Sequence, residues 1–582
     1  MKLRILRLGF LLLVLCVSVV NAFSLDRETF TFVSYDLNVR VEPEQQRLAV
    51  RGKVVLRNDS PIPQKVAVLQ ISSSLDWRAV KAGDKPLQFV TQTYTSDIDH
   101  TGALSEAIVT LPQTIAPKGS VELDLAYEGV ITLDATRLER LGTPEDVART
   151  SDWDQISSTF TAVRGAGNVA WYPIATEEAD LSEANSLFDV LGRLKARQLA
   201  SKMRFQITET GEGEPPQIFV SGAMCIVTMD ERMGLPYSVT TDCGPMPLGP
   251  IVPMLVVASY AVVERPDITV RYLHGHDAAA AAYADAAEKV VPLITDWFGA
   301  PRSKAETTDL SDASAAPFES GAFLLTPLSG SDPKLAGLVA THQLSHAAFS
   351  SPRPWINEGL AHFAQALYLE NARGRQAALD YMGLHRSAFA GTEGGIQKQT
   401  TPPRSEDEIN RSLVNTYDEE RYRSKAMCVW WMLRDMVGDQ ALKKAIASYH
   451  AEQDKEPSYM PRLIQAQTQR DLEWFFDDWV YRDRGLPDFK VESVFPRKTL
   501  KEAYMLTITV ANLGTVGAEV PLTLKSDKGE TTKRIEVRAM SKTVIRMEVS
   551  ALPAEVVVND GSVPESDTTN NVFKVEAGEA AK

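Results

Sequence analysis

Apolar and polar residues alternate along much of the first half of the chain, which is the pattern of β-strands with one buried face. Residues 35–41 read YDLNVRV, and residues 121–133 repeat the alternation as VELDLAYEGVITL. Strand patterns continue to residue 272, interrupted by a less regular stretch at 135–200. We therefore expect an N-terminal β domain over residues 23–272.

Helical spacing begins at Asp277, where the sequence reads DAAAAAYADAAEKVVPLITDWFG, and it dominates the middle of the chain. A mainly α-helical domain is expected over residues 273–487. Beyond Pro487, short strand patterns separated by turns fill residues 488–575, the length of an immunoglobulin-like β-sandwich. Residues 576–582 are predicted to be a loose tail. The predicted fold class is α+β with several domains.

The first 22 residues differ from everything that follows. Lys2, Arg4 and Arg7 precede an unbroken apolar run, which ends in a small-residue site at Ala22. This order is typical of a secretory signal peptide, so we expect residues 1–22 to be removed and the mature protein to be secreted or periplasmic. An uncleaved membrane anchor is the alternative.

The composition is that of an ordinary globular protein, with 582 residues of which 44% are hydrophobic and 24% charged. The net charge is −15 at pH 7, and the predicted signal peptide holds three basic and no acidic side chains, which leaves −18 on the mature chain. So acidic a surface argues against nucleic acid and anionic membranes as partners. After signal cleavage we expect no stable membrane span.

The cysteines leave one question open. Cys225 and Cys243 lie 18 residues apart in a strand-like segment, and in an oxidising compartment they could form a disulfide. Their spacing alone does not decide whether they do. Cys428 lies in an apolar helical run and is expected to be a small buried side chain.

Two histidines and a glutamate stand at metal-ligand spacing. Residues 339–365 read VATHQLSHAAFSSPRPWINEGLAHFAQ, in which His342 and His346 lie four apart in a helical pattern. That spacing places both imidazoles on one helix face, where they can converge on one ion. Zn2+ accepts two imidazoles and a carboxylate, and a catalytic site keeps its fourth position open. Glu358, in the next predicted helix, is the candidate third ligand.

These residues resemble the motif of the gluzincin metallopeptidases of the membrane alanyl aminopeptidase type, HExxH followed by WxNEG. Here the motif reads HQLSH and WINEG, and the segments KAMCVWWMLRDMVGD and DLEWFFDDWVYRDRGLPDF are similar to other parts of that family. The resemblance implies a saddle-shaped N-terminal β domain, a thermolysin-like catalytic domain and a C-terminal sandwich. It also implies Zn2+ as cofactor, a peptide or protein as substrate or ligand, and aminopeptidase activity.

The chain departs from the family motif at its general base. In the family, the glutamate after the first histidine carries a proton from the attacking water to the leaving amine, which the amide of Gln343 cannot do. Gln343 can still hold a water by a hydrogen bond. Because loss of a general base typically costs on the order of 10² to 10⁴ in rate, we expect peptide hydrolysis to be weak or lost.

The family's GAMEN loop is altered as well. Gly321 and Ala322 match its first two residues and are candidate substrate-binding residues by resemblance, but the amine-binding glutamate is absent. Glu319, just upstream, is the candidate replacement. Arg423 occupies the place of the family's transition-state tyrosine, so Tyr422, one residue away, becomes the candidate for that phenol. It can equally be a packing aromatic, as can the weaker candidate Tyr417.

His362 lies four residues after Glu358 and hence on the same helix face. If its ring reaches the metal, it is a fourth ligand that closes the site. Otherwise it orients one of the ligands, or it is simply a packed histidine. His274 and His276, on either side of a glycine, are most simply a polar turn.

Three readings of the function remain. The leading one is a secreted zinc-binding protein with an aminopeptidase-type fold and crippled hydrolysis, a pseudoenzyme. The second is an active zinc aminopeptidase in which another group, such as Glu319 or His362, acts as the base. The third is a non-catalytic interaction protein with a structural zinc or no metal.

Overall fold

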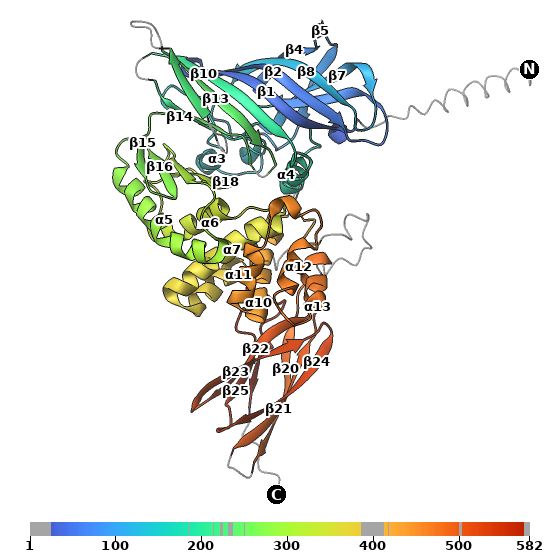
Figure 1. Ribbon diagram of the computed structural model, residues 1–582, viewed down its shortest axis with the longest axis vertical. Coiled ribbons are helices and arrows are strands. Elements are labelled where there is room, and N and C mark those ends of the chain that lie inside the picture. Colours follow the sequence, from blue (N-terminus) through green and yellow to red (C-terminus); the bar gives the residue numbers. More distant parts are fainter. Residues whose placement is uncertain are drawn as a thin grey trace, which may run out of the picture.

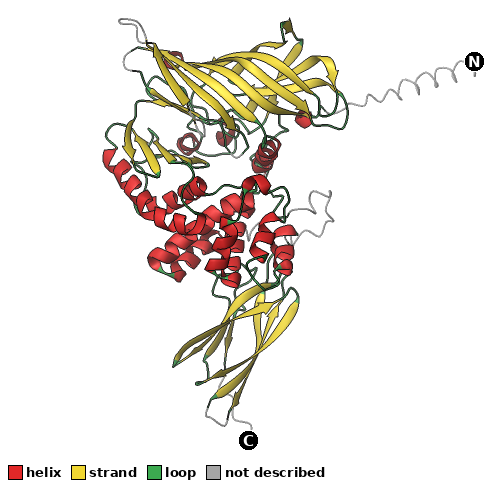
Figure 2. Ribbon diagram, in the orientation of Figure 1, coloured by secondary structure: helices red, strands yellow, loops and turns green. Residues whose placement is uncertain are grey.

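The computed structural model describes residues 25–183, 186–212, 215–220, 225–230, 237–249, 251–385, 412–416, 418–482, 484–499 and 503–575. The predicted signal peptide, the predicted tail and Tyr417 lie outside these residues. The molecule is elongated, with sheets at both ends and helices in the middle (Figures 1 and 2). This arrangement confirms the predicted multidomain α+β class.

An eight-stranded sheet forms the top of the N-terminal region, in the order β12-β13-β10-β1-β2-β8-β4-β5. Its strands are β1 (Phe30–Glu42), β2 (Arg47–Asn58), β4 (Leu75–Ala82), β5 (Lys85–Pro86), β8 (Ser120–Val130), β10 (Lys202–Gly211), β12 (Cys225–Asp230) and β13 (Tyr237–Pro247). The predicted buried face of β1 is confirmed. Its alternating apolar residues are all buried: Tyr35, Leu37, Val39 and Val41.

Two three-stranded sheets complete the N-terminal region, and short helices lie beneath the eight-stranded sheet (Figure 1). The first sheet comprises β3 (Gln64–Ser72), β7 (Ala103–Ile115) and β6 (Phe89–Thr95), and the second β11 (Gln217–Val220), β14 (Leu255–Ala258) and β9 (Thr161–Val163). The helices are α2 (Thr136–Glu139), α3 (Glu145–Ser151) and α4 (Ser186–Arg197), of which α4 faces the helical region.

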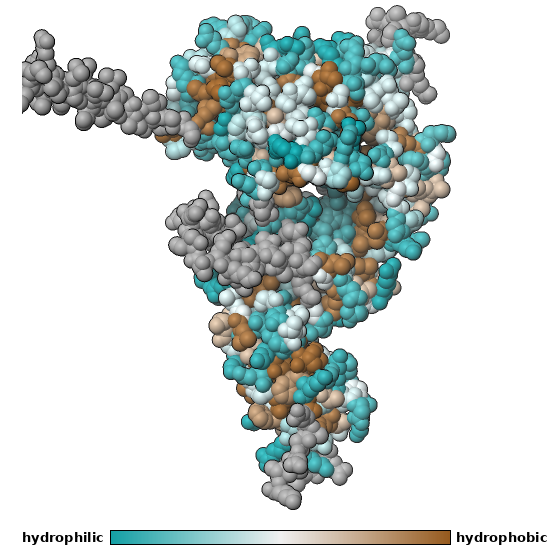
Figure 3. Space-filling view, turned by 180° about the vertical axis from the view of Figure 1, so that it is seen from behind, coloured by the Kyte–Doolittle hydropathy of each residue, from teal (hydrophilic) through white to brown (hydrophobic). Residues whose placement is uncertain are grey.

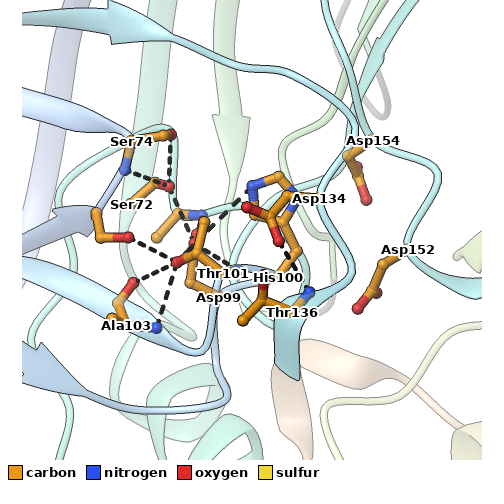
Figure 4. A network of polar contacts seen from close by, with 12 residues as sticks. Ser72, Ser74, Asp99, His100, Thr101, Ala103, Asp134, Thr136, Asp152 and Asp154 are labelled. Atoms are coloured by element: carbon orange, nitrogen blue, oxygen red, sulfur yellow. Dashed lines mark hydrogen bonds and ion pairs between the residues drawn. The ribbon is translucent and has the colours of Figure 1, made fainter. Parts of the chain in front are cut away.

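A buried polar network joins the segments under the sheet (Figure 4). The carboxylate of Asp99 accepts hydrogen bonds from Ser72 Oγ at 3.0 Å and from the amide of Ala170 at 2.8 Å. Close by, Asp152 forms an ion pair with Arg137 at 2.6 Å. These contacts hold in place an irregular part of the chain for which the hydrophobic pattern predicts no helix or strand.

The same underside contacts the central region. Asp154 forms an ion pair with Arg164 at 2.7 Å, and the guanidinium of Arg164 lies 4.0 Å from the ring centre of Trp153 and 5.5 Å from that of Phe318. Trp153 also donates its indole hydrogen to the carbonyl of Ala316 at 2.9 Å. The N-terminal region therefore helps to position the strand that begins at Phe318.

A five-stranded sheet begins the central region. Its order is β15 (Ala261–Glu264), β16 (Ile268–Tyr272), β17 (Ala305–Asp309), β19 (Phe323–Thr326) and β18 (Phe318–Ser320). Helix α5 (Asp277–Phe298) connects the parallel strands β16 and β17. Because β15 and β16 share a sheet with β17 to β19, this sheet crosses the predicted domain boundary at residue 272.

The helical layer follows. It comprises α6 (Ala336–Ala348), α7 (Pro354–Arg373), helical residues 375–385, the π-helix η3 (Glu420–Lys425), α10 (Ala426–Val437), α11 (Asp439–Ala447), α12 (Tyr459–Gln465), α13 (Glu473–Phe476) and the π-helix η5 (Asp477–Tyr481). Helix α10 packs beside α7, and its residues Trp430 and Trp431 are fully buried. None of the helices in the described ranges is long and apolar enough to cross a membrane.

The C-terminal region is a β-sandwich, as predicted. One sheet has the order β20 (Phe489–Lys498), β21 (Tyr504–Asn512), β24 (Ser541–Val549), and the other β23 (Gly529–Val537), β22 (Ala518–Ser526), β25 (Glu555–Val558), β26 (Val572–Lys574). Its hydrophobic core is continuous with that of the helices. At the junction, Trp479 donates its indole hydrogen to the carbonyl of Gly517 at 2.8 Å.

Cys225 and Cys243 form a disulfide between the edge strand β12 and its neighbour β13, where they are directly opposed across the ladder. Cys428 is a buried thiol in α10. In a chain that begins at residue 23, thiol titration in denaturant should therefore find one thiol before reduction and three after. The Cys225→Ser variant should give two before reduction, and three in the unreduced parent chain would contradict the pairing.

Candidate metal centre

Two consecutive helices bring three potential ligands together. His342 and His346 project from α6, and their Nε2 atoms lie 3.2 Å apart. Glu358, in the first turns of α7, places Oε2 3.5 Å from His342 Nε2 and Oε1 3.5 Å from His346 Nε2. The structure therefore brings together the three ligands that the sequence predicts.

The spacing of these atoms fits one zinc ion. Zinc binds nitrogen and carboxylate oxygen at about 2.0–2.2 Å, so neighbouring ligand atoms in a tetrahedral site are about 3.3 Å apart. The observed separations of 3.2, 3.5 and 3.5 Å match this edge length. Two imidazoles and a carboxylate are also the donor set that zinc prefers. The site thus fits a zinc ion in both distance and chemistry.

The asparagine and glycine beside Glu358 explain the local geometry. The side-chain amide of Asn357 lies 3.2 Å from His346 Nδ1 and accepts a hydrogen bond from the amide of Ser351 at 3.0 Å, which ties the loop before α7 to the ligand. A Cβ on Gly359 would stand 2.7 Å from the Cβ of Ala426 and 2.9 Å from Trp430 Nε1. Only glycine lets α7 approach α10 this closely.

Glu319 reaches the same cluster from the sheet. Its Oε2 atom lies 3.4 Å from His342 Nε2, and its donor atom lies within 4.8 Å of those of His342 and His346. Its Oε1 atom is buried and lacks a hydrogen-bond partner among the described residues. The candidate acid of the sequence thus lies at the metal centre.

The turn beside Glu319 has a structural explanation. Strands β18 and β19 form a hairpin in which Ser320 pairs with Phe323, so Gly321 and Ala322 make the two-residue turn. Gly321 has a φ of 60°, which glycine adopts readily. The carbonyl of Ala322 accepts a hydrogen bond from the amide of Glu306 at 3.0 Å. Substrate binding by this turn stays a prediction.

Charged groups surround Glu358. Arg423, in η3, places Nε 3.6 Å from Glu358 Oε2 and also forms an ion pair with Glu419. Lys195, on α4 of the N-terminal region, also lies close to this group. Burial lowers the pKa of Lys195, and the charges of Glu358 and Arg423 have smaller effects on it. Figure 3 shows the surface hollowed between the N-terminal and helical regions, with hydrophilic residues in the hollow.

The protonation of the ligands follows from their charges. Burial opposes ionisation of Glu358, but the two histidines and Arg423 outweigh it and hold the pKa of Glu358 well below its ordinary value. Burial would lower the pKa of His342, but Glu319 and Glu358 raise it overall. Burial lowers the pKa of His346 to about 4, so this ring is neutral near pH 7, as a metal ligand must be.

Gln343 is turned into the protein. Its Oε1 atom accepts hydrogen bonds from the hydroxyls of Tyr283 at 2.9 Å and Thr307 at 3.1 Å. Its Nε2 atom donates to the carbonyls of Glu306 at 2.9 Å and Ala322 at 3.0 Å. Both acceptor and both donor positions of the amide are therefore used, and the expected hydrogen bond to a water at the cluster does not fit this arrangement. Gln343 instead fastens α6 to α5, β17 and the β18–β19 turn.

Tyr422 and His362 lie near the cluster. Burial, with smaller contributions from Glu419 and Glu358, raises the pKa of Tyr422, which packs against the hydrophobic core. The donor atom of His362 lies within 4.8 Å of those of His342 and Glu358. The second histidine pair is elsewhere, at the start of α5, where His276 Nδ1 lies 2.5 Å from a carboxylate oxygen of Asp309.

One protein-family model matches part of the chain. Residues 352–479 match the Peptidase family M1 domain, a segment that includes Glu358 and begins after the two histidines. The match confirms the family resemblance given by the motif. No curated protein sequence is significantly similar to the chain.

Solved structures of an M1 zinc metallopeptidase from Deinococcus radiodurans align with most of the chain. The unmodified protein has 17% sequence identity and a TM-score of 0.45, and the alignment covers 78% of this chain and 94% of that one. A mutant of it bound to a Tyr-Ser-Ala substrate has 17% identity and a TM-score of 0.47, with 79% and 96% covered.

Sequence reasoning missed the groups that act through tertiary contact. It gave no role to Lys195, which comes from a different region, or to Tyr283 and Thr307, which hold Gln343. None of these has a local motif. The only signal in the sequence was Gln343 itself, a polar residue inside an apolar helix, because a buried polar side chain needs hydrogen-bond partners.

Replacing Gln343 by glutamate should lower stability without restoring hydrolysis. The Gln343→Glu side chain cannot donate to the carbonyls of Glu306 and Ala322, so two partly buried carbonyls each lose a donor and face a carboxyl oxygen. We expect the free energy of unfolding to fall by on the order of 3 kcal/mol in denaturant titration. Gln113→Glu, at an exposed position of β7, is the matched control and should change little. A large gain in peptidase activity would contradict this account.

The metal-free protein should lose stability on acidification through His346. Between its folded pKa of about 4 and an unfolded value of about 6.5, only the unfolded chain binds the proton. The free energy of unfolding therefore falls as the pH falls through this window, by about 2 kcal/mol near pH 5. Denaturant titrations with chelator at pH 7 and pH 5 should show a smaller loss for His346→Gln than for the parent chain. Equal losses would show that His346 is not the group responsible.

Proposed function

We propose that this chain is a secreted or periplasmic zinc-binding protein with an aminopeptidase-type metallopeptidase fold, in which peptide-bond hydrolysis is weak or lost. His342, His346 and Glu358 hold the zinc ion. The ligands of the protein are peptides or proteins rather than nucleic acid. When bound, zinc would supply a Lewis acid at the meeting point of α6 and α7.

One observation carries the proposal: every hydrogen-bonding position of the Gln343 amide is used inside the protein. The residue at the place of the general base therefore neither ionises nor faces the ligand atoms. The metal ligands, in contrast, keep zinc-like separations. Retention of the ligands together with loss of the base favours binding over turnover.

Two further observations support the location. The disulfide between Cys225 and Cys243 suits an oxidising compartment outside the cytosol. The basic and apolar segment that precedes residue 23 has the order of a secretory signal. The M1 domain match over residues 352–479 supports peptides as the class of ligand.

A second candidate function is favoured by Glu319. Its carboxylate lies at the cluster, with Oε2 3.4 Å from His342 Nε2 and Oε1 without a hydrogen-bond partner among the described residues. A carboxylate in this position can accept a proton or hold the free amine of a peptide. An active aminopeptidase with Glu319 in place of the usual base is therefore the alternative.

Metal analysis combined with a substrate panel tests both candidates. The purified parent chain should carry about one zinc ion, and His346→Ala should bind it far more weakly because one ligand is lost. Aminoacyl fluorogenic substrates should show little or no chelator-sensitive turnover. A parent chain without metal after zinc-replete expression would contradict zinc binding.

The Glu319→Gln variant separates the two candidates. Substantial turnover in the parent chain that disappears in Glu319→Gln would establish the active alternative. Glu306→Gln is the matched control, because its side chain pairs with Arg271 on the sheet and not with the cluster. It should leave both zinc content and turnover unchanged.

A further inference from the structure

The imidazole of His362 has a specific relation to the metal ligands. His362 follows Glu358 by one turn of α7, and its donor atom lies within 4.8 Å of the donor atoms of Glu358 and His342. Its ring centre is 4.7 Å from that of His342 at an interplanar angle of 68°. For the predicted ligand pair, His342 and His346, the values are 4.9 Å and 71°. His362 and His346 thus lie at nearly the same ring distance and angle from His342.

The outer nitrogen of His362 has no hydrogen-bond partner among the described residues. Nε2 is buried and makes no hydrogen bond to any of the described residues. A buried polar atom left unsatisfied costs about 1–3 kcal/mol, so such atoms are rare unless a ligand uses them. A histidine that only fills space in the core would not require this cost. The unsatisfied nitrogen is therefore available to a ligand, and the neighbouring donors of His342 and Glu358 indicate a metal ion.

The other ring nitrogen fixes which of the two carries the proton. His362 Nδ1 lies 3.4 Å from the hydroxyl oxygen of Tyr381, and that hydroxyl donates its hydrogen to Gln365 Oε1 at 2.7 Å. Gln365 Nε2 in turn donates to the carbonyl of Leu338 in α6 at 3.1 Å, which sets the orientation of its amide.

Because the hydroxyl hydrogen of Tyr381 is used, its oxygen can only accept from His362. The proton of the neutral ring then lies on Nδ1, and the lone pair lies on Nε2. This is the tautomer that binds a metal through Nε2, with the remaining N–H anchored by a neighbour, as metal-bound histidines usually are. The chain of hydrogen bonds holds the ring in place without the metal.

We propose that His362 is a fourth protein ligand, so that three imidazoles and the carboxylate of Glu358 enclose the zinc ion. The inference rests on the zinc binding proposed above and adds that the site is closed. Four protein ligands complete a tetrahedral zinc and leave no open position, which is the arrangement of a structural rather than a catalytic site.

X-ray absorption at the zinc edge tests the ligand count without reference to activity. The zinc-loaded parent chain should show three imidazoles around the metal, and His362→Ala should show two. His385→Ala is the matched control: its ring is next to that of His362, at 5.3 Å, but its Nδ1 bonds to Ser424. That variant should retain three imidazoles.

Zinc affinity, measured by competition with a chelator, gives the second readout. Residues that only orient a ligand typically change metal affinity 10- to 100-fold. We expect His362→Ala to lose more than about 100-fold, and His385→Ala to lose far less. The polar variant His362→Gln keeps the measurement possible if alanine prevents folding.

The outcomes separate the two proposals. Zinc bound by the parent chain through two imidazoles would overturn the fourth ligand and leave the proposed function intact. A parent chain that binds no zinc would overturn both.

Discussion

Nitrogen and oxygen donors that face one another between two helices are well placed to hold a cation. His342, His346 and Glu358 meet at separations of 3.2 to 3.5 Å in a site where little solvent can neutralise them. A buried charge or lone pair of this kind is costly unless it is paired or coordinates a metal. The helices, the loop between them and the glycine contact of α7 with α10 all serve to keep these donors together.

The residue beside the first histidine shows how one position can change its role. A glutamate at position 343 would carry protons, but the glutamine makes four hydrogen bonds that join α6 to the sheet. An amide has the two donors and two acceptors that this environment needs, whereas a carboxylate has only acceptors. The amide of Gln343 is therefore matched to its surroundings.

Much of the architecture was predictable because it depends on local periodicity. The alternation around Tyr35 predicted a buried strand face, and the spacing of His342 and His346 predicted convergence on one helix face. Glu358 was predictable as the third ligand because it stands in the next predicted helix, and the family motif gives it the same role. In each case the information lies within one or two neighbouring elements.

The remainder depends on pairing between distant segments. The disulfide required the register that sets Cys225 opposite Cys243, and their spacing does not contain that register. The approach of Glu319 depends on a hairpin at the sheet edge, and that of Lys195 on the contact between two regions. The orientation of Gln343 could not be predicted, because its partners are two hydroxyls and two carbonyls far away in the sequence.

The most direct test of the metal centre is anomalous diffraction at the zinc edge from crystals of the zinc-loaded mature chain. The account predicts one strong peak between the Nε2 atoms of His342 and His346 and the carboxylate of Glu358, with Gln343 still bonded to the carbonyls of Glu306 and Ala322. Absence of a peak at this place, with zinc present in the crystal, would contradict it.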